Sequence, residues 1–138
     1  MNRTMKNNRG FTLMEMLIVV AVIAILVAVA IPVYNAQMHK ARVAADWANL
    51  RAYYAELQLD YLTSGAYNTN VPLIYADTGA GQTQQKDTST IPFLNGDKVK
   101  LQAGVYWAVW SANGGYQLTY NCNDYGEHGT EHQLVLGG

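Results

Sequence analysis

The residues best placed to do chemistry lie near the N-terminal end, where an acid immediately precedes a long apolar segment. Glu15 is the last charged residue before residues 16–38, which contain no Asp, Glu, Lys, Arg or His. A carboxylate at the centre of a bilayer costs about 2.5–3.5 kcal/mol on insertion scales, so a charge this close to hydrocarbon needs a partner. The simpler interpretation is that Glu15 reaches into the headgroup region at the edge of the span.

A second candidate site lies near the C-terminal end, where Asp124, Glu127, His128 and His132 offer oxygen and nitrogen ligands. The two histidines are four residues apart, but neighbouring glycines make a helix unfavourable there. The segment therefore lacks the helical context of His-Glu-x-x-His, and it does not match an EF-hand loop. We predict a solvated polar loop, with Asp124 and Glu127 as weak metal-ligand candidates and no cofactor.

The remaining reactive residue types form no catalytic pattern. The sequence has no Ser/His/Asp set, phosphate-binding loop or paired carboxylates, so we expect a protein that is not an enzyme. The single cysteine, Cys122, excludes an intrachain disulfide and is predicted to be a small buried residue in a strand. Trp107 and Trp110 are expected in the core rather than on an adhesive surface. His39, just past the apolar segment, is expected at the membrane interface.

The charge is unevenly distributed along the chain. Residues 1–10 carry Arg3, Lys6 and Arg9 and no acid, whereas six basic and ten acidic residues remain after them, a formal charge of −4. An acidic body does not favour general binding of nucleic acid, although local basic spots remain. The positive leader predicts a cytoplasmic N-terminus and an outer C-terminal part.

Residues 16–34 are long enough to cross a bilayer as a helix, and longer than the apolar region of a secretory signal peptide. Pro32 is expected to loosen or kink this helix without ending it. Past the span, an apolar stripe at spacings of three and four predicts that the helix continues to residue 64, with Gly65 after its end. Asp46 is assigned to the polar face, within reach of Arg42. The stripe comprises Val43, Trp47, Leu50, Tyr54, Leu57 and Tyr61.

The stripe is expected to cover a sheet, with a coiled-coil partner as the lesser alternative. Residues 66–97 are rich in turn formers and predict a surface loop with short extended pieces around residues 73–76 and 91–94. Strands are predicted at residues 99–102, 105–111, 116–122 and 133–136, with a hairpin turn at residues 113–115. The fold class is therefore α+β, one long helix packed on a small antiparallel sheet of three to four strands.

The run Gly10-Phe11-Thr12-Leu13-Met14-Glu15, after a basic leader and before an apolar helix with a proline, resembles the signal of type IV pilins and pseudopilins. The resemblance covers residues 1–64. It implies cleavage by prepilin peptidase between Gly10 and Phe11 and N-methylation of Phe11. Assembly machinery in the inner membrane would then move mature subunits out of the bilayer. The subunits would stack on other copies of the same chain in a helical filament.

In that filament the resemblance implies that Glu15 pairs with the Phe11 amine of the adjacent subunit, and that Pro32 belongs to the packed helices. The implied domains are the leader 1–10, the helix 11–64 with halves 11–34 and 35–64, and a β domain at 65–138. A pilus, a type II secretion pseudopilin and a competence DNA-uptake pseudopilin stay open. A protein of a different class, a non-polymerising single-pass membrane protein with a ligand-binding outer domain, is the rival hypothesis.

Overall fold

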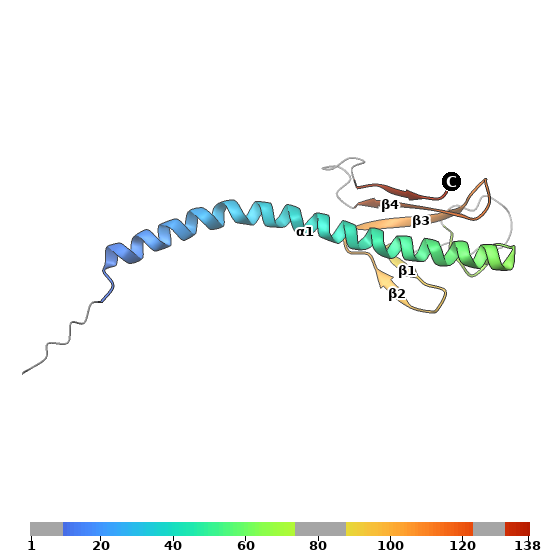
Figure 1. Cartoon of the computed structure of the whole chain (residues 1–138), viewed down its shortest axis with the longest axis horizontal. Helices are drawn as coiled ribbons and strands as arrows, with labels where there is room; N and C mark the ends of the chain where they lie inside the picture. Colours follow the sequence, from blue (N-terminus) through green and yellow to red (C-terminus); the bar gives the residue numbers. More distant parts are fainter. Residues whose placement is uncertain (1–9, 74–87, 123–131) are drawn as a thin grey trace, which may run out of the picture. The chain divides into compact units, whose positions relative to one another are not determined.

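The computed structural model describes residues 10–73, 88–122 and 132–138, and in them one long helix is followed by five short strands (Figure 1). Two compact units divide the chain, Met1–Met38 (the N-terminal unit) and His39–Gly138 (the C-terminal unit), and the helix contributes to both. The predicted α+β class, one long helix packed on a small antiparallel sheet, is confirmed, with the strands divided between a two-stranded and a three-stranded sheet. The elements are α1 (Leu13–Ser64), β1 (Thr90–Pro92), β2 (Lys98–Lys100), β3 (Gly104–Trp110), β4 (Tyr116–Cys122) and β5 (Leu134–Leu136).

The helix α1 is continuous through Pro32, as predicted. Residues 13–38 are all exposed, and this part of α1 is long and apolar enough to cross a membrane by length and composition. The helix ends at Ser64, where Gly65 adopts a positive φ of 71° and donates its N–H to the Tyr61 carbonyl at 2.9 Å. The predicted glycine C-cap is therefore confirmed.

The second part of α1 packs on the strands of the C-terminal unit through one helical face. The fully buried positions are Val43, Asp46, Leu50, Tyr53 and Leu57, at spacings of three, four, three and four. The assignment of Asp46 to the polar face is wrong, because its position lies in the middle of the buried face. The other members of the predicted stripe, Trp47, Tyr54 and Tyr61, flank this face and are half-buried against the core.

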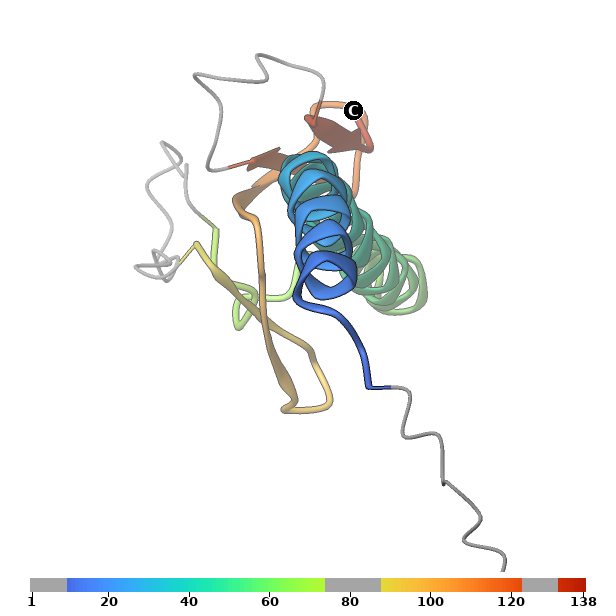
Figure 2. The same cartoon turned by 90° about the vertical axis from the view of Figure 1, so that its left-hand side faces the viewer.

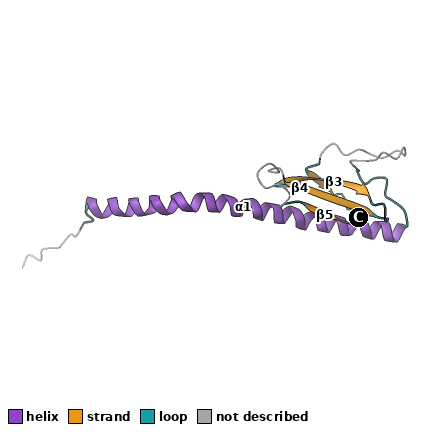
Figure 3. Ribbon diagram, turned by 90° about the horizontal axis from the view of Figure 1, so that it is seen from above, coloured by secondary structure: helices purple, strands orange, loops and turns teal. Residues whose placement is uncertain are grey.

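In the described part of the C-terminal unit, five strands form two antiparallel sheets. The larger sheet has the order β3-β4-β5, and the smaller is the β1–β2 hairpin. In the larger sheet, Tyr106 pairs with Tyr120, and Tyr120 pairs with Leu134. Figure 2 shows the two sheets as separate pieces beside this part of α1, and Figure 3 shows β3, β4 and β5 next to it.

Two connections determine how the strands meet. The β3–β4 hairpin turns where predicted, with positive φ at Gly114 and Gly115, and the Ser111 N–H donates to the Gly115 carbonyl at 2.9 Å. Within the predicted loop at 66–97, β1 overlaps the extended piece expected around residues 91–94, but the surface placement is wrong at Ile91, which is fully buried. Val71 and Leu73 of the same segment also join the core. Burial of these three apolar side chains is favourable, which accounts for their place in the core.

Candidate processing and assembly site

The peptide bond between Gly10 and Phe11 lies in an exposed segment ahead of α1. Both residues precede the first helical residue, Leu13, and the Phe11 side chain is 82% exposed. A Cβ built on Gly10 would meet nothing within 4 Å. The bond is therefore accessible from the surface of the chain, and nothing in the fold of the described residues requires glycine before it.

Thr12 and Glu15 cap the first turn of α1 by exchanging hydrogen bonds. The Thr12 N–H donates to Glu15 Oε2 at 3.0 Å, and the Glu15 N–H donates to Thr12 Oγ1 at 3.2 Å. This reciprocal pair is a capping box, which satisfies two backbone donors that a helix start otherwise leaves open. The carboxylate also lies at the positive end of the helix dipole.

Glu15 therefore has a partner within its own chain, one turn away. From the sequence, the expected partners of Glu15 were the amine of another subunit and the headgroup region, and this partner was missed. The spacing Thr-x-x-Glu ahead of an apolar run was a readable signal for it. The Glu15 carboxylate is thus held against the backbone N–H of Thr12, the residue that follows Phe11.

The helix surface after Glu15 is apolar on every side. Leu13, Met16, Leu17 and Val20 line a shallow apolar hollow on α1. Exposed apolar side chains continue past Pro32, with Tyr34 65% exposed. A helix that is apolar all round belongs either in a bilayer or in a packed helical core.

Asp46, which was predicted on the polar face of the helix, is a buried acid. Its Oδ1 accepts the Gln102 N–H at 2.8 Å, and its Oδ2 accepts the Ala103 N–H at 2.8 Å and the Tyr120 hydroxyl at 3.0 Å. Burial raises the pKa of Tyr120 well above its usual range, and the neighbouring Asp46 carboxylate raises it further. The carboxylate thus joins α1 to the segment before β3 and to β4.

The other candidates from the sequence fall in several places. Asp124, Glu127 and His128 lie outside the described residues. Cys122 is buried at the end of β4, as predicted, and Trp110 packs against the core and stacks on Tyr67 with ring centroids 4.5 Å apart. Trp107 is half-buried on β3.

His39 and His132 are half-buried, and both lie beside Cys122. From the sequence, His39 was expected at the membrane interface and His132 in a solvated polar loop. Neither interpretation anticipated that the two imidazoles and the thiol lie together.

Residues 5–31 match the family model of the prokaryotic N-terminal methylation motif. The chain carries the type IV pilin and pseudopilin signal. The methylation motif contains Gly10, Phe11, the Thr12–Glu15 capping box and the first half of the apolar helix. Together with that helix, the motif fits a type IV pilin-like protein. No curated protein and no solved structure matches the chain.

Proposed function

We propose that the protein is a non-catalytic structural subunit of a type IV pilus or a pilus-like filament. Prepilin peptidase removes residues 1–10, the new amino group of Phe11 is methylated, and α1 holds the subunit in the inner membrane until assembly. The observation that carries the proposal is the methylation motif at residues 5–31. It is supported by an apolar helix that the chain itself leaves unburied.

The exposed apolar helix explains why such a subunit would polymerise. Apolar surface that leaves a bilayer must be covered, and each Å² buried contributes about 25 cal/mol. Side chains such as Leu17 and Val20 on one copy and the same side chains on its neighbours offer this cover. The outer C-terminal unit then forms the surface of the filament, with the C-terminal part outside the cytoplasm.

Within the filament, the Glu15 carboxylate accepts the charged Phe11 amine of an adjacent subunit. A buried carboxylate without a cation is costly, and a wrong axial offset between subunits leaves it in that state. The pair therefore fixes register more than it adds net stability. The capping box turns the Glu15 side chain back toward the N–H of Thr12, the residue next to the one that bears the amine.

Mass spectrometry of the protein extracted from membranes tests the maturation step. We expect a chain that begins at N-methylated Phe11. Gly10→Val should block cleavage and leave an unmethylated chain that is heavier by residues 1–10, while the fold is unchanged because the added side chain meets nothing. An intact Met1 start in cells with active prepilin peptidase would favour the non-polymerising membrane protein instead.

A pair of Glu15 variants separates charge pairing from helix capping. Glu15→Val removes both functions, whereas Glu15→Gln keeps a residue that completes a capping box and removes only the charge. We expect both variants to insert in the membrane and both to fail to form filaments, as counted by electron microscopy of sheared cells. Normal filaments from Glu15→Gln would refute the charge pairing, and normal filaments from both variants would refute any role of Glu15 in assembly.

A further inference from the structure

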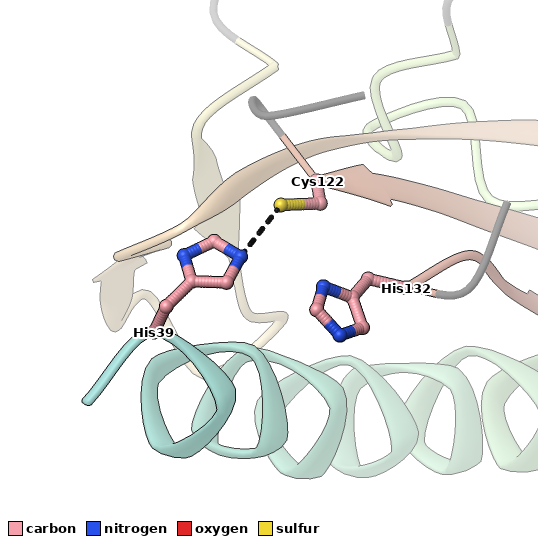
Figure 4. A group of neighbouring side chains, drawn as sticks. All are labelled: His39, Cys122 and His132. Atoms are coloured by element: carbon pink, nitrogen blue, oxygen red, sulfur yellow. Dashed lines mark hydrogen bonds between the residues drawn. The ribbon is translucent and has the colours of Figure 1, made fainter. Parts of the chain in front are cut away.

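Three metal-ligating side chains from three different elements converge in the C-terminal unit. His39 comes from α1, Cys122 is the last residue of β4, and His132 comes two residues before β5 (Figure 4). One ligand atom of each lies within 4.8 Å of the other two. The Cys122 Sγ is 3.2 Å from His39 Nε2, and the two imidazole centroids are 5.3 Å apart.

The fold itself brings these residues together. Tyr120 pairs with Leu134 in the β4–β5 ladder, and the same register continued by two residues on each strand sets Cys122 opposite His132. His39 is one helical turn before Val43, so it lies on the face of α1 that becomes buried. Two separate packing relations, the β4–β5 register and the buried face of α1, therefore bring the three side chains to one point.

The spacing fits a single metal ion of the zinc type. Bond lengths of about 2.3 Å to sulfur and 2.0–2.1 Å to nitrogen put the ligands of a tetrahedral zinc ion about 3.3–3.6 Å apart. The sulfur–nitrogen separation of 3.2 Å is slightly shorter than this spacing, and the other separations are at most 4.8 Å, so side-chain shifts of about 1 Å bring the ligand atoms into range. Thiolate with imidazole is a ligand set that selects zinc and copper over calcium and magnesium.

We propose that His39, Cys122 and His132 form a mononuclear Zn²⁺ site. The Cys122 thiol gives up its proton to solvent when its sulfur binds the ion, and each imidazole binds through one neutral ring nitrogen. Three protein ligands leave the fourth tetrahedral position to water. The site cross-links α1 to the β4–β5 end of the larger sheet in a chain whose single cysteine allows no internal disulfide. It stands independently of the filament function.

The test uses the full chain in detergent, stripped of metal with a chelator and kept reduced. Titration with Zn²⁺, followed by calorimetry in two buffers of different ionisation enthalpy, should give one ion bound per chain with release of protons. Co²⁺ in place of zinc should produce a thiolate-to-cobalt charge-transfer band and the strong visible bands of tetrahedral coordination. Added Zn²⁺ should abolish both signals.

Single variants at the three ligands should each weaken Zn²⁺ binding more than about 100-fold, since loss of an outer-shell partner alone costs about 10–100-fold. Cys122→Ser should also remove the charge-transfer band. The matched control is His39→Gln with Ala48→His, which restores the number of histidines at an exposed position of α1. It should bind zinc as weakly as His39→Gln alone.

The unmodified chain can refute the site by itself, whatever the variants do to folding. Octahedral Co²⁺ spectra without a thiolate band would overturn it, as would the absence of a stoichiometric Zn²⁺ binding step in calorimetry. Binding of Cu⁺ with no binding of Zn²⁺ or Co²⁺ would overturn the assignment to zinc.

Discussion

Replacing Asp46 should destabilise the C-terminal unit more than any exposed acid can. Its side chain is fully buried, and its two oxygens accept three hydrogen bonds from neutral donors. Asp46→Ala leaves two backbone N–H groups and the Tyr120 hydroxyl without their acceptor. Each bond to a charged group contributes about 1.5–3 kcal/mol. Removal also relieves the cost of burying the carboxylate, so the net loss should be about 3–5 kcal/mol.

That loss is a large part of the total free energy of unfolding of a domain, which is roughly 5–15 kcal/mol. For a unit of this size it corresponds to a decrease in Tm of at least about 12 °C. Asp46→Asn keeps the shape of the side chain, but its amide NH₂ group then faces N–H and O–H donors that the carboxylate accepted. We expect this variant to lower the free energy of unfolding by about 2–3 kcal/mol. The assay is urea unfolding followed by tryptophan fluorescence, which reports this unit because Trp47, Trp107 and Trp110 all lie in it.

Glu56→Gln is the matched control for both variants. The Glu56 carboxylate is half-buried and accepts the Leu94 N–H at 3.1 Å, a bond that the amide oxygen of glutamine can also accept. Its loss should stay below about 1 kcal/mol. If Asp46→Ala and Asp46→Asn destabilise no more than this control, the carboxylate does not hold α1 to the sheet in the way described here.

Burial raises the pKa values of Tyr53 and Tyr120, so the folded unit keeps two protons that the unfolded chain loses near pH 10. The free energy of unfolding should therefore be constant with respect to these groups below about pH 10 and decrease above it. A urea midpoint that does not change from about pH 9 to about pH 12 would contradict this. Gly104→Ala places a Cβ against the Asn121 carbonyl and the Tyr120 ring, and should cost about 1–3 kcal/mol in the same assay, whereas Gly10→Ala should cost nothing measurable. Thr12→Ala removes the acceptor of the Glu15 N–H, so hydrogen exchange at that amide should accelerate about fivefold, equivalent to about 1 kcal/mol, with tryptophan-detected unfolding unchanged. An unchanged exchange rate would argue against the capping box.

Elements governed by local pattern were predictable from the sequence. The alternation in residues 116–122 is the β4 strand residue for residue, and the glycines after residue 113 turn the hairpin. The apolar run and the glycine after Ser64 defined α1 to within two residues at each end. These features depend on neighbours in the chain, which the sequence displays directly.

Features that depend on partners distant in the chain were not predictable in this way. Asp46 has the right spacing for the buried face, but a carboxylate is normally solvent-exposed. It can be buried here because the backbone before β3 supplies hydrogen-bond donors, and the sequence does not reveal this contact. The proximity of His39, Cys122 and His132 requires the helix face and the strand register together, and no fixed spacing connects 39 with 122. The match at residues 5–31 likewise says nothing about the sheets.

The capping box at the start of α1 has a consequence for how a filament would be taken apart. The Glu15 carboxylate has two oxygens that can each accept hydrogen bonds, so it can keep the Thr12 N–H on Oε2 while it accepts the amine of another subunit. In the proposed filament, a subunit that leaves the polymer would therefore not leave this carboxylate without a hydrogen-bond donor. That lowers the cost of losing the neighbouring amine, and no covalent bond has to form or break at this residue.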